Sequence, residues 1–245
     1  MLSPNHQKEN IPHWRYNTIP VSRRTTLNPQ NPAILWDMDG TIFDSKACHY
    51  QTWKHTLNQF GFDFSQEDFD ATFGRNNHAT ITLLLGFDPD PELFEDIVKI
   101  KEAYFRKLAP QATRLVPGVI NWLTDARSFN LPQGLASSAP MENIQSLLVN
   151  FNLTEYFDQI VSGEHLPAKP EPDVFLKAAQ ALGRPPENCW VIEDSQPGVE
   201  AAKNAGMTCI AVTTNLPPTK LKSADLILED FLKPLESVLK RFHVI

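Results

Sequence analysis

The sequence has few cysteines and no long apolar segment. Its 245 residues include three cysteines, Cys48, Cys189 and Cys209, an odd number without CxxC spacing. This pattern predicts neither a disulfide framework nor a zinc site, so we expect reduced and mostly buried thiols. No window approaches the ~18 consecutive apolar residues of a membrane helix, and the segment MLSPNHQKEN at the start lacks a secretory apolar stretch. We therefore expect a cytoplasmic protein without a membrane partner.

Positive charge is also scarce. The chain has 22 Lys and Arg against 29 Asp and Glu, for a formal net charge of −7, and no basic cluster follows residue 24. Binding to a nucleic-acid backbone needs a basic patch, so we expect no nucleic-acid partner. With 42% hydrophobic and 21% charged residues, the composition is that of an ordinary globular protein. The length predicts one large domain or a core with a smaller second domain.

Residues 1–32 differ from the rest of the chain. They carry four basic residues against one acid, Glu9, and five prolines interrupt any periodicity. A transit peptide is also basic and poor in acids, but such peptides form amphipathic helices, which the prolines oppose. We predict an irregular N-terminal arm that wraps the domain.

From residue 33 onward, short apolar runs alternate with helical stretches. This alternation is typical of strand–helix units around a parallel sheet, and it predicts an α/β fold. The expected strands cover residues 33–37, 133–137, 159–161, 189–193, 209–212 and 225–228, and the expected helices lie near 118–129, 141–150, 171–182, 197–205 and 234–242.

The interval from Ser45 to about Arg114 has helical periodicity and no good strand. Apolar and aromatic residues recur there at spacings of three and four, as in Trp53, Leu57 and Phe60, which favours packing within a bundle. An insertion at this place lies over the carboxyl end of the first strand, where ligands bind in open α/β sheets. We predict a core domain of residues 33–44 and 115–245, with a helical cap domain of residues 45–114 inserted after the first strand.

The strongest functional signal is the segment Asp37-Met38-Asp39-Gly40-Thr41, which follows the apolar run 33–36. Positions two apart on a strand share a face, so Asp37 and Asp39 are expected to present two carboxylates to one site. Such carboxylates stay ionised most readily beside a divalent cation, and oxygen ligands select Mg²⁺. The alternatives are a simple turn or a calcium loop, but an EF-hand counted from Asp37 needs glutamate where this chain has Cys48.

Polar residues also end other predicted strands. The pair Glu193-Asp194 follows a buried run and either caps the helix near Pro197 or joins the first two carboxylates on the same metal. Ser137 stands between a strand and a helix, a position suited to hydrogen-bonding phosphate oxygens, and Lys169 precedes another helix. Taken singly, the serine could be a cap and the lysine a solvated charge. Their order along the strand–helix units favours a shared site.

These motifs resemble those of the haloacid dehalogenase superfamily of phosphohydrolases, and within it the beta-phosphoglucomutase-like subgroup. The resemblance covers about residues 33–230 and rests on DMDGT at 37–41, Ser137, Lys169 in AKPEPD, and VIEDSQPG at 191–198. It implies a Rossmann-like core, a helical cap inserted after the first strand, and an obligatory Mg²⁺.

The resemblance also implies roles in the core. Asp37 matches the nucleophile that forms an aspartyl-phosphate, and Asp39 matches the general acid/base. Mg²⁺ would be held by Asp37, the backbone carbonyl of Asp39, Asp194 and Glu193. The phosphate-binding residues would be Thr41, Ser137 and Lys169, with Thr41 also helping to position Asp39.

In the cap, the segment Phe73-Gly74-Arg75-Asn76 resembles one in which an arginine holds a distal anionic group of the substrate. His49 and Trp53 match mutase-like positions at the hinge and in the cap, and Lys101 aligns with a cap lysine. Each has a structural alternative: His49 could be a core histidine and Lys101 a solvated charge.

Three functions remain open. The first is a Mg²⁺-dependent phosphatase of a small phosphorylated metabolite, such as a sugar phosphate. The second is a beta-phosphoglucomutase-type isomerase, which hands the phosphoryl group to a second hydroxyl of the sugar instead of to water. Ala139-Pro140, where mutases carry more polar residues, weakens this reading. The third is a non-catalytic binding module, which the full set of acidic and basic motif residues opposes. A monomer is the default expectation.

Overall fold

Six short apolar runs form one parallel sheet in the computed structural model, which describes residues 31–245. The strand order is β5-β4-β1-β6-β7-β8, so the first strand lies in the middle of the sheet. The strands are β1 (Ala33–Trp36), β4 (Gln133–Ser137), β5 (Gln159–Ser162), β6 (Cys189–Glu193), β7 (Thr208–Val212) and β8 (Leu226–Leu228). Each lies close to a predicted strand. Almost all of the predicted N-terminal arm falls outside the described residues.

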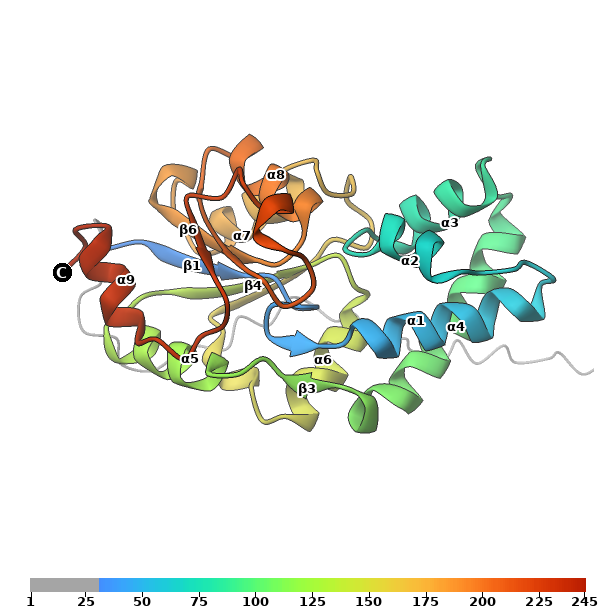
Figure 1. The fold of residues 1–245 in the computed structure, drawn as a ribbon, viewed down its shortest axis with the longest axis horizontal. Helices are drawn as coiled ribbons and strands as arrows, with labels where there is room; N and C mark the ends of the chain where they lie inside the picture. Colours follow the sequence, from blue (N-terminus) through green and yellow to red (C-terminus); the bar gives the residue numbers. More distant parts are fainter. Residues whose placement is uncertain (1–30) are drawn as a thin grey trace, which may run out of the picture.

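Helices cover both faces of this sheet (Figure 1). Because side chains alternate along a strand, Ile34 and Trp36 pack on one face of β1 while Ala33 and Leu35 pack on the other. The first face is covered by α5 (Val119–Ser128), α6 (Met141–Asn150) and α9 (Leu235–Arg241), and the second by α7 (Asp173–Ala181) and α8 (Gln196–Asn204). Burial on both faces explains why the strands are apolar throughout, and the predicted α/β fold is confirmed.

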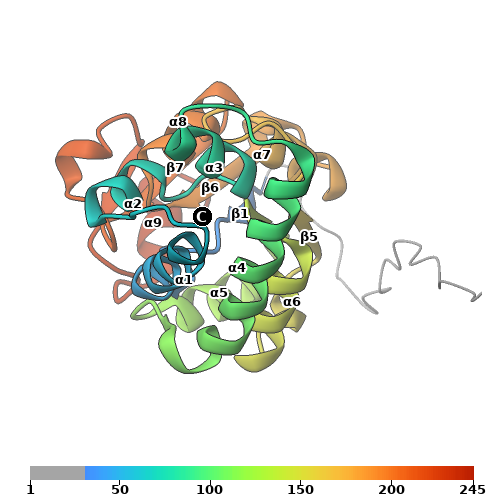
Figure 2. The same cartoon turned by 90° about the vertical axis from the view of Figure 1, so that its right-hand side faces the viewer.

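Four helices lie between the first strand and the rest of the core. They are α1 (Lys46–Gln59), α2 (Gln66–Thr72), α3 (Asn77–Leu85) and α4 (Pro91–Ala112). They enclose a separate apolar cluster that includes Trp53 and Leu57, with Phe60 packed against it, the residues whose spacing predicted a helix bundle. Figure 2 looks onto these helices, with the sheet behind them. The separate cluster favours the predicted division into cap and core, which stays a prediction.

A short ribbon that the sequence did not predict joins the two ends of this insertion. Strand β2 (Phe43–Asp44) pairs antiparallel with β3 (Arg114–Leu115), and Phe43 lies opposite Leu115. Each strand has only two residues, too few to show an alternating pattern in the sequence. The ribbon fixes where the chain leaves the core and where it returns.

The remaining elements are short. Three 3-10 turns lie at η1 (Thr154–Tyr156), η2 (Pro186–Asn188) and η3 (Pro218–Lys220). All three cysteines are free and buried, as the sequence predicts. Among the described residues, no helix is both long and apolar enough to cross a bilayer.

Candidate active site

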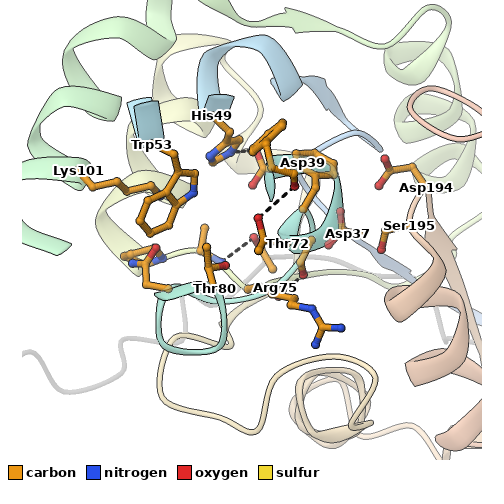
Figure 3. Close-up of a pocket in the computed structure, with 18 residues that line it drawn as sticks. Asp37, Asp39, His49, Trp53, Thr72, Arg75, Thr80, Lys101, Asp194 and Ser195 are labelled. Atoms are coloured by element: carbon orange, nitrogen blue, oxygen red, sulfur yellow. Dashed lines mark hydrogen bonds and ion pairs between the residues drawn. The ribbon is translucent and has the colours of Figure 1, made fainter. Parts of the chain in front are cut away.

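A cavity lies between the carboxyl ends of the central strands and the cap helices (Figure 3). Its lining includes eight of the eleven residues singled out from the sequence: Asp37, Asp39, His49, Trp53, Arg75, Lys101, Ser137 and Asp194. Lys169 and Glu193 do not line the cavity. Lys169 bonds to Asp37, which does line it, and Glu193 bonds to Lys169. Thr41 is the one residue of the eleven that neither lines the cavity nor bonds to another of them through its side chain. Its buried hydroxyl has no hydrogen-bond partner in the described part of the chain, and it lies outside the cavity lining.

A tight turn carries the two central aspartates. Strand β1 ends at Trp36, one residue earlier than predicted, so this turn and not strand alternation places Asp37 and Asp39. The backbone amide of Gly40 donates to the carbonyl of Phe43 at 2.6 Å, and Gly40 has φ of +89°. A Cβ at this position would lie 2.0 Å from Oδ2 of Asp194. Glycine is therefore required both for the left-handed backbone and for the close approach of Asp194.

Lys169 holds Asp37 from behind the cavity. Its Nζ donates to Oδ1 of Asp37 and to Oε1 of Glu193, both at 2.6 Å, and its side chain is 1% exposed. The ammonium also lies 4.8 Å from the ring centroid of Phe175. A lysine buried this fully needs anionic partners, and the two carboxylates supply them.

Glu193 is anchored at the start of α8. Its Oε2 accepts from the backbone amides of Asp194 and Ser195, each at 2.7 Å, and from the Ser195 hydroxyl at 2.9 Å. A Cβ on Gly198 would lie 1.7 Å from Oε1 of Glu193, so only glycine fits beside this carboxylate. Glu193 thus combines the two roles that the sequence left as alternatives: it caps the helix, and it stands within the acidic cluster.

The acidic cluster can hold a divalent cation. One carboxylate oxygen from each of Asp37, Glu193 and Asp194 lies within 4.8 Å of the others, and all three residues are at most 6% exposed. Three carboxylates and the single ammonium of Lys169 leave two negative charges unbalanced. Hard oxygen donors with this excess charge fit a cation such as Mg²⁺.

The same crowding shifts the protonation of two of these acids. Burial, opposed by Lys169 and assisted by Glu193, raises the pKa of Asp37 to about 8. Burial together with Glu193 and Asp37 raises the pKa of Asp194 well above its usual value. The side-chain amide of Asn215 donates to Oδ2 of Asp194 at 2.7 Å and counteracts part of this rise. A bound cation would keep both carboxylates ionised.

Asp39 has a different set of partners. Its Oδ1 accepts from the Ser45 hydroxyl at 2.6 Å and lies 2.9 Å from Nε2 of His49. Burial alone would raise the pKa of Asp39, but the charge of His49 and the hydrogen bonds from His49 and Ser45 lower it below its usual value. His49 in turn stacks on Phe105 at 4.5 Å. The two aspartates therefore face one cavity from two distinct electrostatic environments.

The cap contacts the core beside the predicted phosphate-binding serine. The hydroxyl of Ser138 donates to the carbonyl of Gly74 at 3.1 Å, and the amide of Asn76 donates to the carbonyl of Leu166 at 3.1 Å. Ser137 accepts from the backbone amide of Ala139 at 3.1 Å, which fixes its hydroxyl at the end of β4. Gly74 and Ser138 both line the cavity, so the bond between them joins the cap to the core at its edge.

The cap residues divide into two positions. Trp53 and Lys101 lie together on one side of the cavity, with Nζ of Lys101 5.0 Å from the centroid of the Trp53 ring. Lys101 is 4% exposed, so it is not the solvated charge of the structural alternative. The side chain of Arg75 points away from both residues (Figure 3), and its Nε is buried without a hydrogen-bond partner among the described residues.

Sequence reasoning missed several residues that shape this site. Ser45, Asn215 and Glu102 each bond to a residue of the cavity, and none was singled out. Asn215 follows β7, the neighbour of β6, so the rule that carboxyl ends of parallel strands meet at one edge could have found it. Ser45 and Glu102 lie in helical segments whose side-chain contacts no short motif reveals.

A family model described as haloacid dehalogenase-like hydrolase matches residues 34–212. Fructose-1-phosphate phosphatase YqaB of Escherichia coli is 30% identical over 188 residues, which cover 73% of this chain and 95% of that protein. The crystal structure of beta-phosphoglucomutase from Clostridium difficile superimposes with a TM-score of 0.79 at 25% identity, covering 87% of this chain and 98% of that one. The chain belongs to the haloacid dehalogenase-like hydrolase family, as its motifs predicted, and is an enzyme of that class.

A plant protein shares the same region within a much longer chain. Protein SUPPRESSOR OF QUENCHING 1, chloroplastic, of Arabidopsis thaliana is 34% identical over 201 residues, which cover 78% of this chain. The matched region spans only 19% of that protein.

Proposed function

We propose that this haloacid dehalogenase-like hydrolase is a Mg²⁺-dependent phosphatase that removes the phosphoryl group from a small phosphorylated sugar. The observation that carries the proposal is the separation of partners at the two aspartates. Lys169 and the acidic cluster surround Asp37, whereas His49 and Ser45 hold Asp39, 2.9 and 2.6 Å away respectively. Two carboxylates in distinct environments at one cavity suit a nucleophile and a separate acid/base.

In the first step, Asp37 attacks the phosphorus. Lys169 holds Oδ1, so we assign the attack to Oδ2. The negative charge of the bound phosphate favours the protonated form of Asp39, which takes up a proton from solvent as the substrate binds. The bond between phosphorus and the ester oxygen then breaks as the bond to Asp37 forms, and the departing oxygen takes this proton from Asp39. In the second step, a water gives its proton to Asp39 and attacks the aspartyl-phosphate. The products are the free sugar, inorganic phosphate and the original carboxylate of Asp37.

Charge near the phosphoryl group is balanced by this chain's own residues. We assign the Ser137 hydroxyl, which lines the cavity at the end of β4, as a donor to phosphoryl oxygens, and the Lys169 ammonium, which bonds to Asp37 from behind the cavity, as a nearby positive charge. Stabilising developing charge is the dominant protein contribution to phosphoryl transfer. Asp37, Glu193, Asp194 and the backbone carbonyl of Asp39 would hold Mg²⁺, which when bound would neutralise the carboxylates and the phosphate. Glu193 also places Lys169 and the start of α8.

The cap favours a small substrate. Bonds from Ser138 to Gly74 and from Asn76 to Leu166 hold it against the core, over the cavity. The similarity to a fructose-1-phosphate phosphatase supports a sugar phosphate. We also propose that the protein is cytoplasmic and monomeric.

A beta-phosphoglucomutase-type isomerase is the second candidate. It must protect its aspartyl-phosphate from water, and the contact between cap and core at Gly74 and Ser138, together with the His49–Asp39 contact, suits that task. The structural similarity to beta-phosphoglucomutase supports it as well. In this reaction the aspartyl-phosphate is transferred to another hydroxyl of the sugar.

One assay separates the candidates. The protein is incubated with Mg²⁺ and a panel of sugar monophosphates, and both inorganic phosphate and isomerised sugar are followed. Phosphate release at a rate matching substrate loss supports the phosphatase. Isomer without net phosphate, stimulated by a sugar bisphosphate, would establish the mutase instead. Failure to turn over any ester, p-nitrophenyl phosphate included, would contradict both.

A further inference from the structure

Glu102 is a buried carboxylate beside the cavity that the proposed reaction does not use. It lies on α4, is 4% exposed, and both of its oxygens are bonded. Oε1 accepts from Nζ of Lys101 at 2.8 Å and from the side-chain amide of Asn77 at 2.7 Å, and Oε2 accepts from the side-chain amide of Asn143. Burying a carboxylate is costly unless its partners are well placed, so this arrangement specifies one geometry.

These bonds connect the cap to the core. Asn77 and Glu102 lie on the cap helices α3 and α4, whereas Asn143 lies in the first turn of α6, the helix that follows the Ser137 loop. Nη1 of Arg106, one turn after Glu102 on α4, donates to Oδ1 of Asn143 at 2.9 Å. Arg106 thereby fixes the orientation of the Asn143 amide, whose nitrogen then faces Glu102. Two side chains of α4, those of Glu102 and Arg106, therefore bond to the same core residue, Asn143.

Glu102 also determines where the ammonium of Lys101 stands. A lysine side chain is flexible, but this one is confined by the carboxylate and by the rings of Trp53 and Phe105, 5.0 and 5.5 Å from Nζ. Lys101 and Trp53 both line the cavity on the side away from Asp194 (Figure 3). An ammonium has three N–H donors, and Glu102 takes one of them.

We propose that Glu102 is a positioning residue that links docking of the cap on α6 to the placement of Lys101 in the cavity. When the cap is docked, Asn143 and Asn77 orient the Glu102 carboxylate, which presents the Lys101 ammonium to the sugar end of the substrate. When the cap lifts, the bond to Asn143 breaks and this orientation is lost. The proposal rests on the proposed function, because it assigns Lys101 to the part of the substrate that lies away from the phosphoryl group.

Two variants test this link from its two ends. Glu102→Gln keeps the shape of the side chain, but its amide nitrogen would face the amide nitrogen of Asn143, and two donors cannot bond to each other. Asn143→Ala removes only the partner on the core. In each, kcat/KM for the best sugar phosphate of the panel should fall about tenfold or more, the usual effect of losing a charged hydrogen bond. Turnover of p-nitrophenyl phosphate, which has no hydroxyl-bearing end, should fall far less. Equal losses on both substrates in both variants would overturn the proposal.

A double variant shows whether Glu102 acts through Lys101. If it does, Lys101→Met with Glu102→Gln should be no slower on the sugar phosphate than Lys101→Met alone. A purely structural role for Glu102 would make the two losses multiply, and that result would refute the proposal. Glu236→Gln is the matched control, because the Glu236 side chain pairs with Lys240 on the solvent-exposed side of α9, and its kinetics should equal those of the wild type.

A measurement independent of turnover separates this proposal from the proposed function. Urea unfolding of Glu102→Gln, Asn143→Ala and the double variant should show that the two losses of stability do not add, because each single change already breaks the bond between cap and core. Additive losses would refute the link whatever the activity. A wild-type protein inactive on every ester would instead refute the proposed function.

Discussion

Nε2 of His49 lies 2.9 Å from Oδ1 of Asp39, whereas the ammonium of Lys169 bonds to Asp37, two residues earlier in the chain. This contact keeps Asp39 ionised and oriented in the resting site, while Asp37 belongs to the crowded acidic cluster. Asp39 is therefore assigned the proton transfers and Asp37 the attack.

Asp39→Asn should separate the two chemical steps. p-Nitrophenolate leaves without a proton, so the first step should still proceed on p-nitrophenyl phosphate, whereas hydrolysis of the aspartyl-phosphate should slow by about 10²–10⁴-fold without its base. Stopped-flow absorbance should show a burst of about one nitrophenolate per active site. A steady-state rate close to that of the wild type would show that Asp39 transfers no proton.

Asp194→Ala should weaken Mg²⁺ binding and reduce the rate together. The variant loses one carboxylate of the cluster and the partner of Asn215. Titrating activity against Mg²⁺ should give a higher half-saturating concentration with partial recovery at high metal. Asn215→Ala is a matched comparison: it keeps the carboxylate and should shift the titration less. A metal dependence equal to that of the wild type in Asp194→Ala would remove this residue from the metal site.

Glu102 should make the stability of the protein depend on acid pH. Burial opposes ionisation, but Lys101 and the bonds from Asn77 and Asn143 lower the pKa of Glu102 below its usual value. Its contribution is therefore complete above the unfolded pKa of about 4.3 and is lost as pH falls through the lower folded pKa. The difference in unfolding free energy between the wild type and Glu102→Gln should be largest near neutral pH and shrink below about pH 4. A difference that stays constant over this range would contradict the ionised, paired carboxylate.

Arg75→Ala tests the cap arginine that the sequence singled out. If Arg75 holds a distal anionic group of the substrate, its loss should reduce kcat/KM for a phosphorylated sugar far more than for p-nitrophenyl phosphate, because remote binding energy also drives cap closure. In a mutase the variant should also release more phosphate per isomerised sugar. If both substrates lose activity by the same factor, or neither does, Arg75 holds no part of the substrate and its role is structural.

The parts of the fold and site that could be predicted share one property. Strands buried on both faces appear as apolar runs, and polar residues at their ends mark the edge where ligands bind, as with Asp37 after β1 and Ser137 at the end of β4. Local patterns of this kind are present in the sequence itself. They were enough to place the sheet, the helical insertion and eight of the residues that line the cavity.

The parts that could not be predicted depend on contacts between distant segments. The β2–β3 ribbon has two residues per strand and forms because the ends of the insertion meet. Glu102 and Asn143 are 41 residues apart, and their bond follows from the docking of α4 on α6. Arg75 lines the cavity, but the direction of its side chain, away from Trp53 and Lys101, is set by the packing around it, which a single sequence does not encode.

The central claim is that Asp37 is the nucleophile, and trapping the covalent intermediate tests it most directly. Asp39→Asn is mixed with p-nitrophenyl phosphate and Mg²⁺, quenched in acid during the burst, and reduced with borohydride, which converts an aspartyl-phosphate to homoserine. Peptide mass spectrometry should find homoserine at position 37, and Asp37→Asn should give neither burst nor homoserine while remaining folded. Homoserine at another residue, or a burst in Asp37→Asn, would contradict the account.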